Sequence, residues 1–364
     1  MRVLLDATPM LGTRTGVGAY TSSLLAALAR RPEVDTGALT LGVTTFSARA
    51  RRVTDLPPQI RQVGAPLPAR LLRSFWLRSS FPPLELIAGR CDVFHGTNFV
   101  SPPTVRAATV VTIHDLTYEH LRETVTTDVL AYRELVAQSL RRGAHVLTPT
   151  ETVAEQVRDF YGLSPERVRA THLGVDPAWS SAPMLTTSIR ARLGLPERYL
   201  LFVGSLDPRK NLPTLISAHA AAQRADHDVP PLVLAGPAGR TQGADLPGVI
   251  RTGWLDGNEL RSVVATSAGL ILPSLDEGFG LPLVEALACG RPVLASDLPV
   301  LREVAGTQAE FADPTIEGLL DGVHRLVAAP DDEQARASRR TWASRFTWDA
   351  TAEGTLAAYR AAGA

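Results

Sequence analysis

The 364-residue sequence has little cysteine, few aromatic residues and no excess of either charge. Its two cysteines, Cys91 and Cys289, are too few for a disulfide framework, so we interpret them as small buried residues of a protein in a reducing cytoplasm. The formal net charge of zero argues against a nucleic-acid-binding protein. No apolar run reaches about 18 residues, and the first ten residues lack a signal-peptide pattern. We therefore expect a cytoplasmic protein without a membrane span.

What is present is the composition of a folded α/β protein. Apolar residues make up 45% and charged residues 20%, and 364 residues are too many for one ordinary core. Short apolar strands alternate with helical patterns, which predicts parallel sheets built from βαβ units. The first series has strands at 2–7, 92–96, 109–115 and 145–150, with helices at 18–31, 127–142 and 151–161. The second has strands at 199–204, 231–236, 249–253, 269–273 and 291–296, with helices at 211–224, 257–266, 282–288 and 315–328.

The two series predict two doubly wound, Rossmann-like domains that face each other across a cleft. We place the N-terminal domain at 1–178, the C-terminal domain at 179–345 and a closing helix within 346–364. Phe346, Trp348, Leu356 and Tyr359 are expected to form one apolar stripe on that helix. In such sheets ligands bind at the carboxyl ends of the strands, so we look for candidate residues there.

The loop "DEGFGLPLVE", residues 276–285, follows the apolar strand at 269–273. Pro282 suits the start of a helix, and free N–H groups at a helix N-terminus favour a phosphate. Gly278 and Gly280 allow the main chain to approach a ligand closely. Glu277 precedes the helix, whereas Glu285 is expected in its first turn. Carboxylates on both sides of a phosphate site fit a nucleotide sugar, although a first-turn glutamate that complements the helix dipole is the alternative for Glu285.

Arg209 and Lys210 follow the strand at 199–204, in the stretch "GSLDPRKN" that begins at Gly204. An arginine fork and a lysine ammonium can neutralise a diphosphate. The alternative is two solvated charges, but the start of a helix disfavours bare cations. In the first domain, Gly16 and Gly18 belong to the stretch "TGVGAY", which predicts either a loop close to a diphosphate or a plain turn.

No metal site is expected from the sequence. The only D-x-D match, Asp226–His227–Asp228, lies between a helix and a strand and is better read as a solvated turn. No Cys/His cluster has the spacing of a zinc site, and no cofactor is expected. Residues 48–80 carry seven arginines, Arg49, Arg51, Arg52, Arg61, Arg70, Arg73 and Arg78. This segment predicts either a contact with an anionic membrane or a solvated face with aromatic anchors.

The stretch "EGFGLPLVEALACGRPVLASD", residues 277–297, resembles the E-x7-E signature of retaining, GT-B-fold glycosyltransferases of the family 4 (group 1) type. The resemblance covers nearly the whole chain. Matching stretches include "DVFHGTNFVSPP", "VTIHDLTY", "HVLTPTETVAEQV", "LGVDP", "FVGSLDPRKN" and "FTWDATAEGTLAAYRAA". Many relatives carry an arginine directly after the glycine that ends the strand, where this chain has Ser205. Arg209 is therefore a less secure match than Lys210.

The resemblance implies a retaining hexosyltransferase that needs no metal ion. The C-terminal domain would bind a nucleotide-diphosphate sugar, with GDP-mannose favoured because "GVGAY" and "PRKN" resemble mannosyltransferase-like members. The N-terminal domain would bind a saccharide, lipid-linked or small-molecule acceptor, and the closing helix would return to that domain. The catalytic candidates are His114, Arg209, Lys210 and Glu277. The donor-binding candidates are Gly16, Gly18, Gly204, Arg209, Lys210, Glu277, Gly278, Phe279, Gly280, Leu281 and Glu285.

Three alternatives stay open at this point. One is a GT-B epimerase or hydrolase that turns over a nucleotide sugar without an acceptor. Another is a non-catalytic protein that only binds a nucleotide sugar. The third concerns His95, in "VFHGTN", which lines the acceptor side on one interpretation and belongs to the core on the other.

Overall fold

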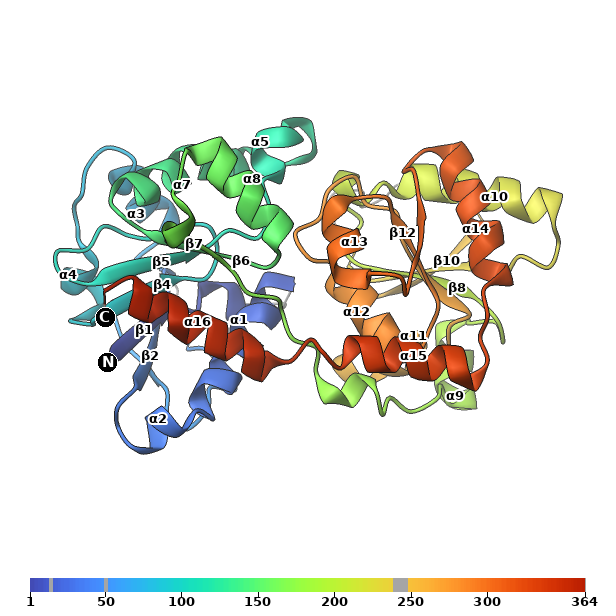
Figure 1. Cartoon of the computed structure of the whole chain (residues 1–364), viewed down its shortest axis with the longest axis horizontal. Helices are drawn as coiled ribbons and strands as arrows, with labels where there is room; N and C mark the ends of the chain where they lie inside the picture. Colours follow the sequence, from blue (N-terminus) through green and yellow to red (C-terminus); the bar gives the residue numbers. More distant parts are fainter. Residues whose placement is uncertain (13–15, 49–51, 238–247, 364) are drawn as a thin grey trace. The chain divides into compact units, whose positions relative to one another are not determined.

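The computed structural model describes residues 1–12, 16–48, 52–237 and 248–363. These form two compact units, and each is described here by itself (Figure 1). The first unit comprises Met1–Gly174 together with Trp348–Ala364, and the second comprises Val175–Thr347. Both are α/β units built on a fully parallel, Rossmann-like sheet, as the alternating pattern predicts. The predicted limits after residues 178 and 345 differ from these boundaries by a few residues.

The first unit has a seven-stranded sheet in the order β3-β2-β1-β4-β5-β6-β7. Its strands are β1 (Arg2–Asp6), β2 (Thr40–Thr44), β3 (Arg61–Gln62), β4 (Val93–Gly96), β5 (Ala108–Thr112), β6 (His145–Thr148) and β7 (Val168–Ala170). Its helices are α1 (Gly16–Ala29), α2 (Pro32–Asp35), α3 (Ala69–Trp76), α4 (Leu84–Ala88), α5 (Thr117–His120), α6 (Thr127–Leu130), α7 (Tyr132–Arg141), α8 (Glu151–Tyr161) and α16 (Trp348–Ala361).

The second unit has a six-stranded sheet in the order β10-β9-β8-β11-β12-β13. Its strands are β8 (Leu200–Val203), β9 (Leu232–Ala235), β10 (Val249–Gly253), β11 (Gly269–Leu272), β12 (Val293–Ser296) and β13 (Glu310–Ala312). Its helices are α9 (Thr187–Leu193), α10 (Leu212–Ala225), α11 (Gly257–Thr266), α12 (Leu281–Ala288), α13 (Pro299–Ala305), α14 (Ile316–Ala328) and α15 (Glu333–Ala343).

In both sheets the chain adds strands first on one side of the unit's first strand and then on the other side. In the second unit the chain runs from β8 outward through β9 to β10, and then crosses over so that β11 lies on the other side of β8. The corresponding reversal in the first unit falls between β1 and β4. Loops that leave neighbouring strands in opposite directions open a crevice at their carboxyl ends, and ligands of doubly wound sheets bind there. The β8–β11 pair is therefore the place to look for a site in the second unit.

Local sequence explains where individual elements start and stop. Thr150 caps α8, because its side chain accepts a hydrogen bond from the backbone N–H of Val153, and Gly162 ends the helix in the left-handed conformation. Four strands of the second unit, β8, β9, β11 and β12, are buried along their whole length. Fully buried parallel strands read as continuous apolar runs, which is why the sequence reveals them readily.

Several predicted boundaries are wrong. The helix predicted at 127–142 is two helices, α6 and α7. Gly16 and Gly18 lie in the first turn of α1 rather than in a loop, and residues 13–15 before them lie outside the described part. The helix α12 starts at Leu281, so Glu285 is its fifth residue and lies beyond the first turn. No described helix is long and apolar enough to cross a membrane.

The closing helix α16 belongs to the first unit, where it contacts α1, β5, β6 and β7 (Figure 1). Leu356 and Tyr359 are buried there. Phe346 precedes the helix and belongs to the second unit, where its ring meets Phe279 edge to face at 5.7 Å. The prediction of a single stripe that includes Phe346, Leu356 and Tyr359 is therefore wrong, because α16 starts at Trp348 and Phe346 lies two residues before the helix.

Candidate active site

Three sequence-predicted residues meet at the carboxyl ends of β8 and β11. Lys210 Nζ donates to Glu277 Oε1 at 2.5 Å, and Arg209 Nη1 lies 3.3 Å from Glu277 Oε2. Ser274, two residues after the end of β11, donates its hydroxyl to Glu277 Oε1 at 2.7 Å. Arg209 also donates to the carbonyl of Asp276 at 2.5 Å, which joins the two loops. The result is a cationic cluster with one buried carboxylate at its centre.

The charges of this cluster keep Glu277 ionised. Burial alone raises the pKa of a carboxyl group, but Lys210 and Arg209 overcome that effect and lower the pKa of Glu277 to about 2. The formal charges of Glu277, Lys210 and Arg209 sum to one positive charge. A lysine ammonium has three N–H donors, so Lys210 can hold Glu277 and a ligand oxygen at the same time.

Two glycines let the β8 and β9 loops come together next to Lys210. Gly204 has φ +153° and Gly236 has φ +141°. A Cβ atom on Gly236 would lie 2.1 Å from the carbonyl oxygen of Gly204, which is a contact that no side chain tolerates. A Cβ atom on Gly204 would lie 3.8 Å from Lys210 Cε. Gly204 thus lies beside the cationic cluster, and Gly236 was not singled out from the sequence, although it ends the apolar run "LVLAG".

The remaining residues of the predicted loop shape the start of α12. Gly280 caps the helix with φ +85°, and a Cβ atom there would come within 2.7 Å of Leu301 Cδ2. The positive φ and this close contact together favour glycine at this position. Gly278 is buried, and Leu281, the first residue of α12, is half-buried. The ring of Phe279 packs against Phe346 in the core.

Glu285 lies on α12 in surroundings that differ from those of Glu277. Burial raises the pKa of Glu285 to about 7; Arg261 opposes this shift and Asp176 adds to it. Among the described residues, no hydrogen bond or ion pair reaches its carboxylate. The two glutamates of the loop therefore differ in protonation, because cations surround Glu277 and desolvation dominates at Glu285. Pairs of carboxyl groups whose environments separate their pKa values are common at active sites.

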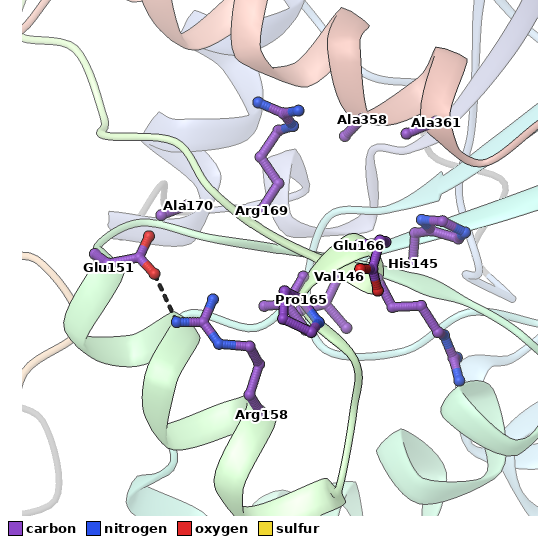
Figure 2. Close-up of a pocket in the computed structure, with 12 residues that line it drawn as sticks. His145, Val146, Glu151, Arg158, Pro165, Glu166, Arg169, Ala170, Ala358 and Ala361 are labelled. Carbon is purple, nitrogen blue, oxygen red and sulfur yellow. Dashed lines mark hydrogen bonds and ion pairs between the residues drawn. The ribbon is translucent and has the colours of Figure 1, made fainter.

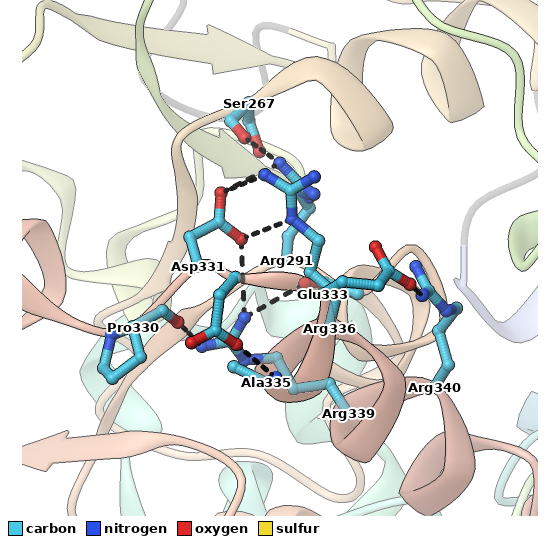
Figure 3. Close-up of polar contacts among 11 residues, drawn as sticks. Ser267, Arg291, Pro330, Asp331, Glu333, Ala335, Arg336, Arg339 and Arg340 are labelled. Carbon is cyan, nitrogen blue, oxygen red and sulfur yellow. Dashed lines mark hydrogen bonds and ion pairs between the residues drawn. The ribbon is translucent and has the colours of Figure 1, made fainter.

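A polar network holds the far end of α12 in place (Figure 3). Arg339 donates to the carbonyl of Gly290, two residues after the helix ends, at 3.1 Å. Asp331 accepts two hydrogen bonds from Arg336, at 3.0 and 2.8 Å, and a longer one from Arg291. These contacts tie α15 and the loop before it to α12, and so fix the helix that carries Glu285.

In the first unit, His114 lies two residues beyond the end of β5. Its Nε2 is 2.9 Å from the carbonyl of Thr97. A carbonyl only accepts, so Nε2 carries the proton and Nδ1 of the neutral ring is an acceptor. Burial lowers the pKa of His114, although the bond to Thr97 and the charge of Asp115 oppose the shift. No described residue hydrogen-bonds to Nδ1. His114 is thus a neutral imidazole with one acceptor nitrogen available.

Several residues around His114 were not singled out from the sequence. Tyr20 of α1 meets its ring edge to face at 5.1 Å, and Phe99 does so at 5.6 Å. Asp6 ends β1, where Thr8 donates both its N–H and its hydroxyl to the buried carboxylate. Burial raises the pKa of Asp6, with Thr8 and the nearby charge of Arg73 acting in the opposite direction. The position of Asp6 at the end of the first strand was the available signal.

His95, whose role was open, is a core residue. Its Nδ1 hydrogen-bonds to the hydroxyl of Tyr359 at 2.8 Å, and its Nε2 to that of Thr112 at 2.7 Å. Tyr20 reaches the same Thr112 hydroxyl at 2.9 Å. Burial lowers the pKa of His95 to about 3, so the ring is neutral at physiological pH. Both ring nitrogens are used, which leaves nothing for a ligand.

This network predicts a loss of stability for Tyr359→Phe. The variant leaves Nδ1 of His95 buried without a partner, which costs about 1–3 kcal/mol of unfolding free energy. Urea denaturation of the purified variant measures the change. Tyr161→Phe, which also removes a tyrosine hydroxyl bond but nearer the surface of the same unit, is the matched control and should cost less. A Tyr359→Phe protein as stable as the wild type would contradict the structural role of His95.

A hollow of about 340 Å³ lies elsewhere in the first unit, among β6, β7, α8 and α16 (Figure 2). Arg158 pairs there with Glu151 at 2.6 Å, and Arg167 donates to the carbonyls of Leu140 and Ala144. Arg169 points toward Ala358 of α16 (Figure 2). The hollow shares no lining residue with either cluster described above, and most of its arginine charge is already engaged.

Metal coordination finds no support among the described residues, where no group of three His, Cys, Asp or Glu side chains could hold an ion. The Asp226–Asp228 turn lies between α10 and β9, at the amino end of that strand, and Asp226 accepts the N–H of Asp228. The cationic side chains and backbone of the β8–β11 site are thus the groups available to an anionic ligand.

Comparison with known proteins identifies the class. Residues 14–179 match the family described as Glycosyltransferase Family 4, and residues 197–337 match Glycosyl transferases group 1. The chain therefore belongs to the family 4, group 1 glycosyltransferases of GT-B fold, and is a nucleotide-sugar glycosyltransferase.

Individual relatives agree with this class at low identity. The chain is 26% identical over 383 residues to O-antigen chain mannosyltransferase B of Escherichia coli, covering 99% of this chain and 100% of that protein. Among solved structures, sucrose-phosphate synthase from Thermosynechococcus elongatus matches with a TM-score of 0.75 and 19% identity over 99% of this chain and 98% of that one. HepE from Anabaena, solved in complex with UDP-glucose, matches with a TM-score of 0.70 and 17% identity over 98% and 99% of the two chains. At these identities the structural matches show the fold alone.

Proposed function

We propose that the protein is a retaining glycosyltransferase that needs no metal ion and transfers mannose from GDP-mannose to an acceptor hydroxyl. The observation that carries this proposal is the cluster of Lys210, Arg209 and Glu277 at the β8–β11 reversal. It offers net positive charge to a diphosphate without any metal ligands. The similarity to a mannosyltransferase supports the sugar, whereas the UDP-glucose complex of HepE makes UDP-glucose the rival donor.

In the proposed reaction, the bond from the sugar C1 to the diphosphate oxygen breaks, and the acceptor oxygen bonds to C1 on the same face. The acceptor proton passes to the departing diphosphate, so no nucleophile from the protein is required. Lys210 and Arg209 stabilise the negative charge that develops on the leaving oxygen, and fixed donors of this kind supply much of the rate in such sites. The start of α12 adds its backbone N–H groups.

The two glutamates take different parts of the donor in this proposal. Glu277 stays ionised and lies within the cationic cluster, so it accepts hydrogen bonds from the sugar hydroxyls. Glu285 has a carboxylate without a hydrogen-bond partner among the described residues, and ribose hydroxyls would supply the missing donors. The backbone at Gly16 and Gly18 and the acceptor nitrogen of His114 belong to the first unit. We assign His114 to orienting the sugar or the acceptor, and that unit to binding a saccharide, lipid-linked or small-molecule acceptor in the cytoplasm.

A nucleotide screen and a turnover assay test the proposal together. Among nucleoside diphosphates, GDP should give the largest thermal shift, since a ligand at 100-fold its Kd stabilises a protein by about 2.7 kcal/mol. Transfer should then proceed unchanged in EDTA and yield a product with the anomeric configuration of the donor, which NMR reads directly. Activity that EDTA abolishes and Mg²⁺ restores would contradict metal independence. Donor turnover that needs no acceptor would identify an epimerase or hydrolase instead.

A further inference from the structure

Exposed hydrophobic side chains gather on one part of the first unit. Of the eleven large hydrophobic residues that are exposed in the described part of the chain, six lie between residues 63 and 105: Val63, Leu71, Phe75, Phe81, Leu86 and Val105. Scattered exposed apolar residues need no explanation, but a contiguous group marks an interaction surface. The question is therefore whether these side chains adjoin one another and what would cover them.

The helix α3 presents apolar residues on its outer side as well as on its inner side. Leu72 and Trp76 are buried, and α3 contacts α7 (Figure 1). Leu71 and Phe75 are 53% and 50% exposed and lie one turn apart on another face. Ser79 hydrogen-bonds to the carbonyls of Phe75 and Phe81, which brings Phe81 next to Phe75. Leu71, Phe75 and Phe81 form what we call the α3 face.

The α3 face is held rigidly although it is exposed. Trp76 Nε1 donates to the carbonyl of Pro82 at 3.0 Å, which fixes the loop that follows the helix. From α7, Gln138 donates to the carbonyl of Leu77, and Arg142 donates to those of Trp76 and Ser79. A fixed apolar surface binds a partner without a large cost in conformational entropy.

The surroundings of the α3 face are basic. The described residues 52–106 contain seven arginines and three acids, the arginines being Arg52, Arg61, Arg70, Arg73, Arg78, Arg90 and Arg106, and the acids Asp55, Glu85 and Asp92. Glu85 accepts backbone N–H groups of Val105, Arg106 and Ala107, and Asp92 pairs with Arg2 at 2.9 Å. Glu85 and Asp92 are thus engaged within the fold, and the arginines of this stretch outnumber its acids by seven to three. Arg49 and Arg51 of the predicted basic segment lie outside the described residues.

We propose that the α3 face docks on an anionic lipid surface, with Leu71, Phe75 and Phe81 in the interface and Arg70 and Arg78 among the headgroups. Aromatic and leucine side chains flanked by arginines are what an interfacial helix requires. A twofold contact between two copies of the face is disfavoured, because it would bring two surfaces with an excess of arginine together. Charge complementarity therefore favours lipid over a second copy of the chain.

The helix α3, through Arg73, is connected to His114 by a short series of contacts within the first unit. The guanidinium of Arg73, on α3, lies 5.3 Å from the centre of the Tyr132 ring. Tyr132 stacks on Phe99 at 5.0 Å, and Phe99 meets His114 at 5.6 Å. Docking would thus place a membrane beside the carboxyl edge of this sheet. The proposal does not depend on which donor the second unit binds.

Vesicle flotation tests the docking. The full-length protein should float with vesicles of phosphatidylcholine and phosphatidylglycerol and stay behind with phosphatidylcholine alone. The double variant Leu71→Ser/Phe75→Ser should lower the partition coefficient at least about tenfold, because two apolar side chains no longer enter the interface. Arg78→Ala should lower it about fivefold, and added salt should weaken binding further. Met184→Ser, at an equally exposed apolar residue of the second unit, is the control and should change nothing.

Three results would overturn the proposal: no flotation with the anionic vesicles, equal flotation of the wild type and the double variant, or equal binding to neutral vesicles. A wild-type dimer in solution that the double variant converts to a monomer would do so as well, since the face would then be a protein interface. Calorimetry with GDP on the same variants separates this test from the proposed function. A variant that no longer docks but still binds GDP has lost the lipid-binding surface alone, and its donor site is intact.

Discussion

Lys210→Ala will lower kcat at least about 100-fold, on the scale of losing one donor that stabilises developing negative charge. Lys210 is the cation nearest to Glu277, at 2.5 Å, and the described residues offer no group of metal ligands to replace it. If this ammonium stabilises the negative charge of the departing diphosphate, the substitution will affect the chemical step rather than the affinity for the acceptor. Steady-state kinetics with saturating donor and acceptor measure the change in kcat.

The variant also removes the partner of a buried carboxylate, so a loss of folding must be separated from a loss of catalysis. Lys210→Ala leaves Glu277 with the longer contact to Arg209 and the bond from Ser274. The double variant Lys210→Ala/Glu277→Gln also removes the carboxylate that has lost its nearest cation, and should recover stability while activity stays low. Arg192→Ala removes an exposed cation of the same unit, so it is the matched control and should leave kcat unchanged. Recovery of kcat in the double variant would contradict a catalytic role for Lys210.

The sequence was informative about the second unit because its strands are buried on both faces and are followed by short loops. Apolar runs such as "LLFV" and "GLIL" mark β8 and β11, and the charged residues after them had to lie at one edge of the sheet. The meeting of Arg209, Lys210 and Glu277 followed from that topology. The strand β13, with two half-buried residues and one buried residue, gave a weaker signal and was missed.

The surroundings of individual side chains could not be predicted from the sequence. Glu277 precedes α12 and Glu285 lies within it, yet cations 67 and 68 residues away in the chain keep the first glutamate ionised, whereas burial raises the pKa of the second. His95 lies in β4 and His114 follows the neighbouring strand β5, but only His95 has both ring nitrogens engaged, one of them by Tyr359. These differences arise from contacts between distant parts of the chain, which local patterns do not encode.

Glu285→Gln will stabilise the ligand-free protein at pH 8 and weaken its binding of the nucleoside diphosphate. The pKa of Glu285 is raised to about 7 from an ordinary value of 4.5, so the folded state keeps a proton that the unfolded state releases. Stability from this group is therefore greatest below pH 4.5 and falls as the pH rises through 7. Above pH 7 the folded state bears the full cost of burying the ionised carboxylate. Removing that cost should raise the free energy of unfolding by about 2 kcal/mol, since a half-buried carboxyl group retains some hydration.

The same substitution should lower the affinity for the nucleotide at least about tenfold, because a carboxylate that accepts ribose hydroxyls forms stronger hydrogen bonds than an amide. Urea denaturation at pH 8 and pH 5 measures stability, and calorimetry with GDP at pH 8 measures affinity. The gain in stability should shrink at pH 5, where wild-type Glu285 is already protonated in the folded state. Glu197→Gln, at an exposed glutamate of the same unit, should change neither quantity. A variant that loses affinity and stability together would show that Glu285 supports the fold, whereas opposite changes identify a carboxylate that is kept at a cost in stability for the ligand it binds.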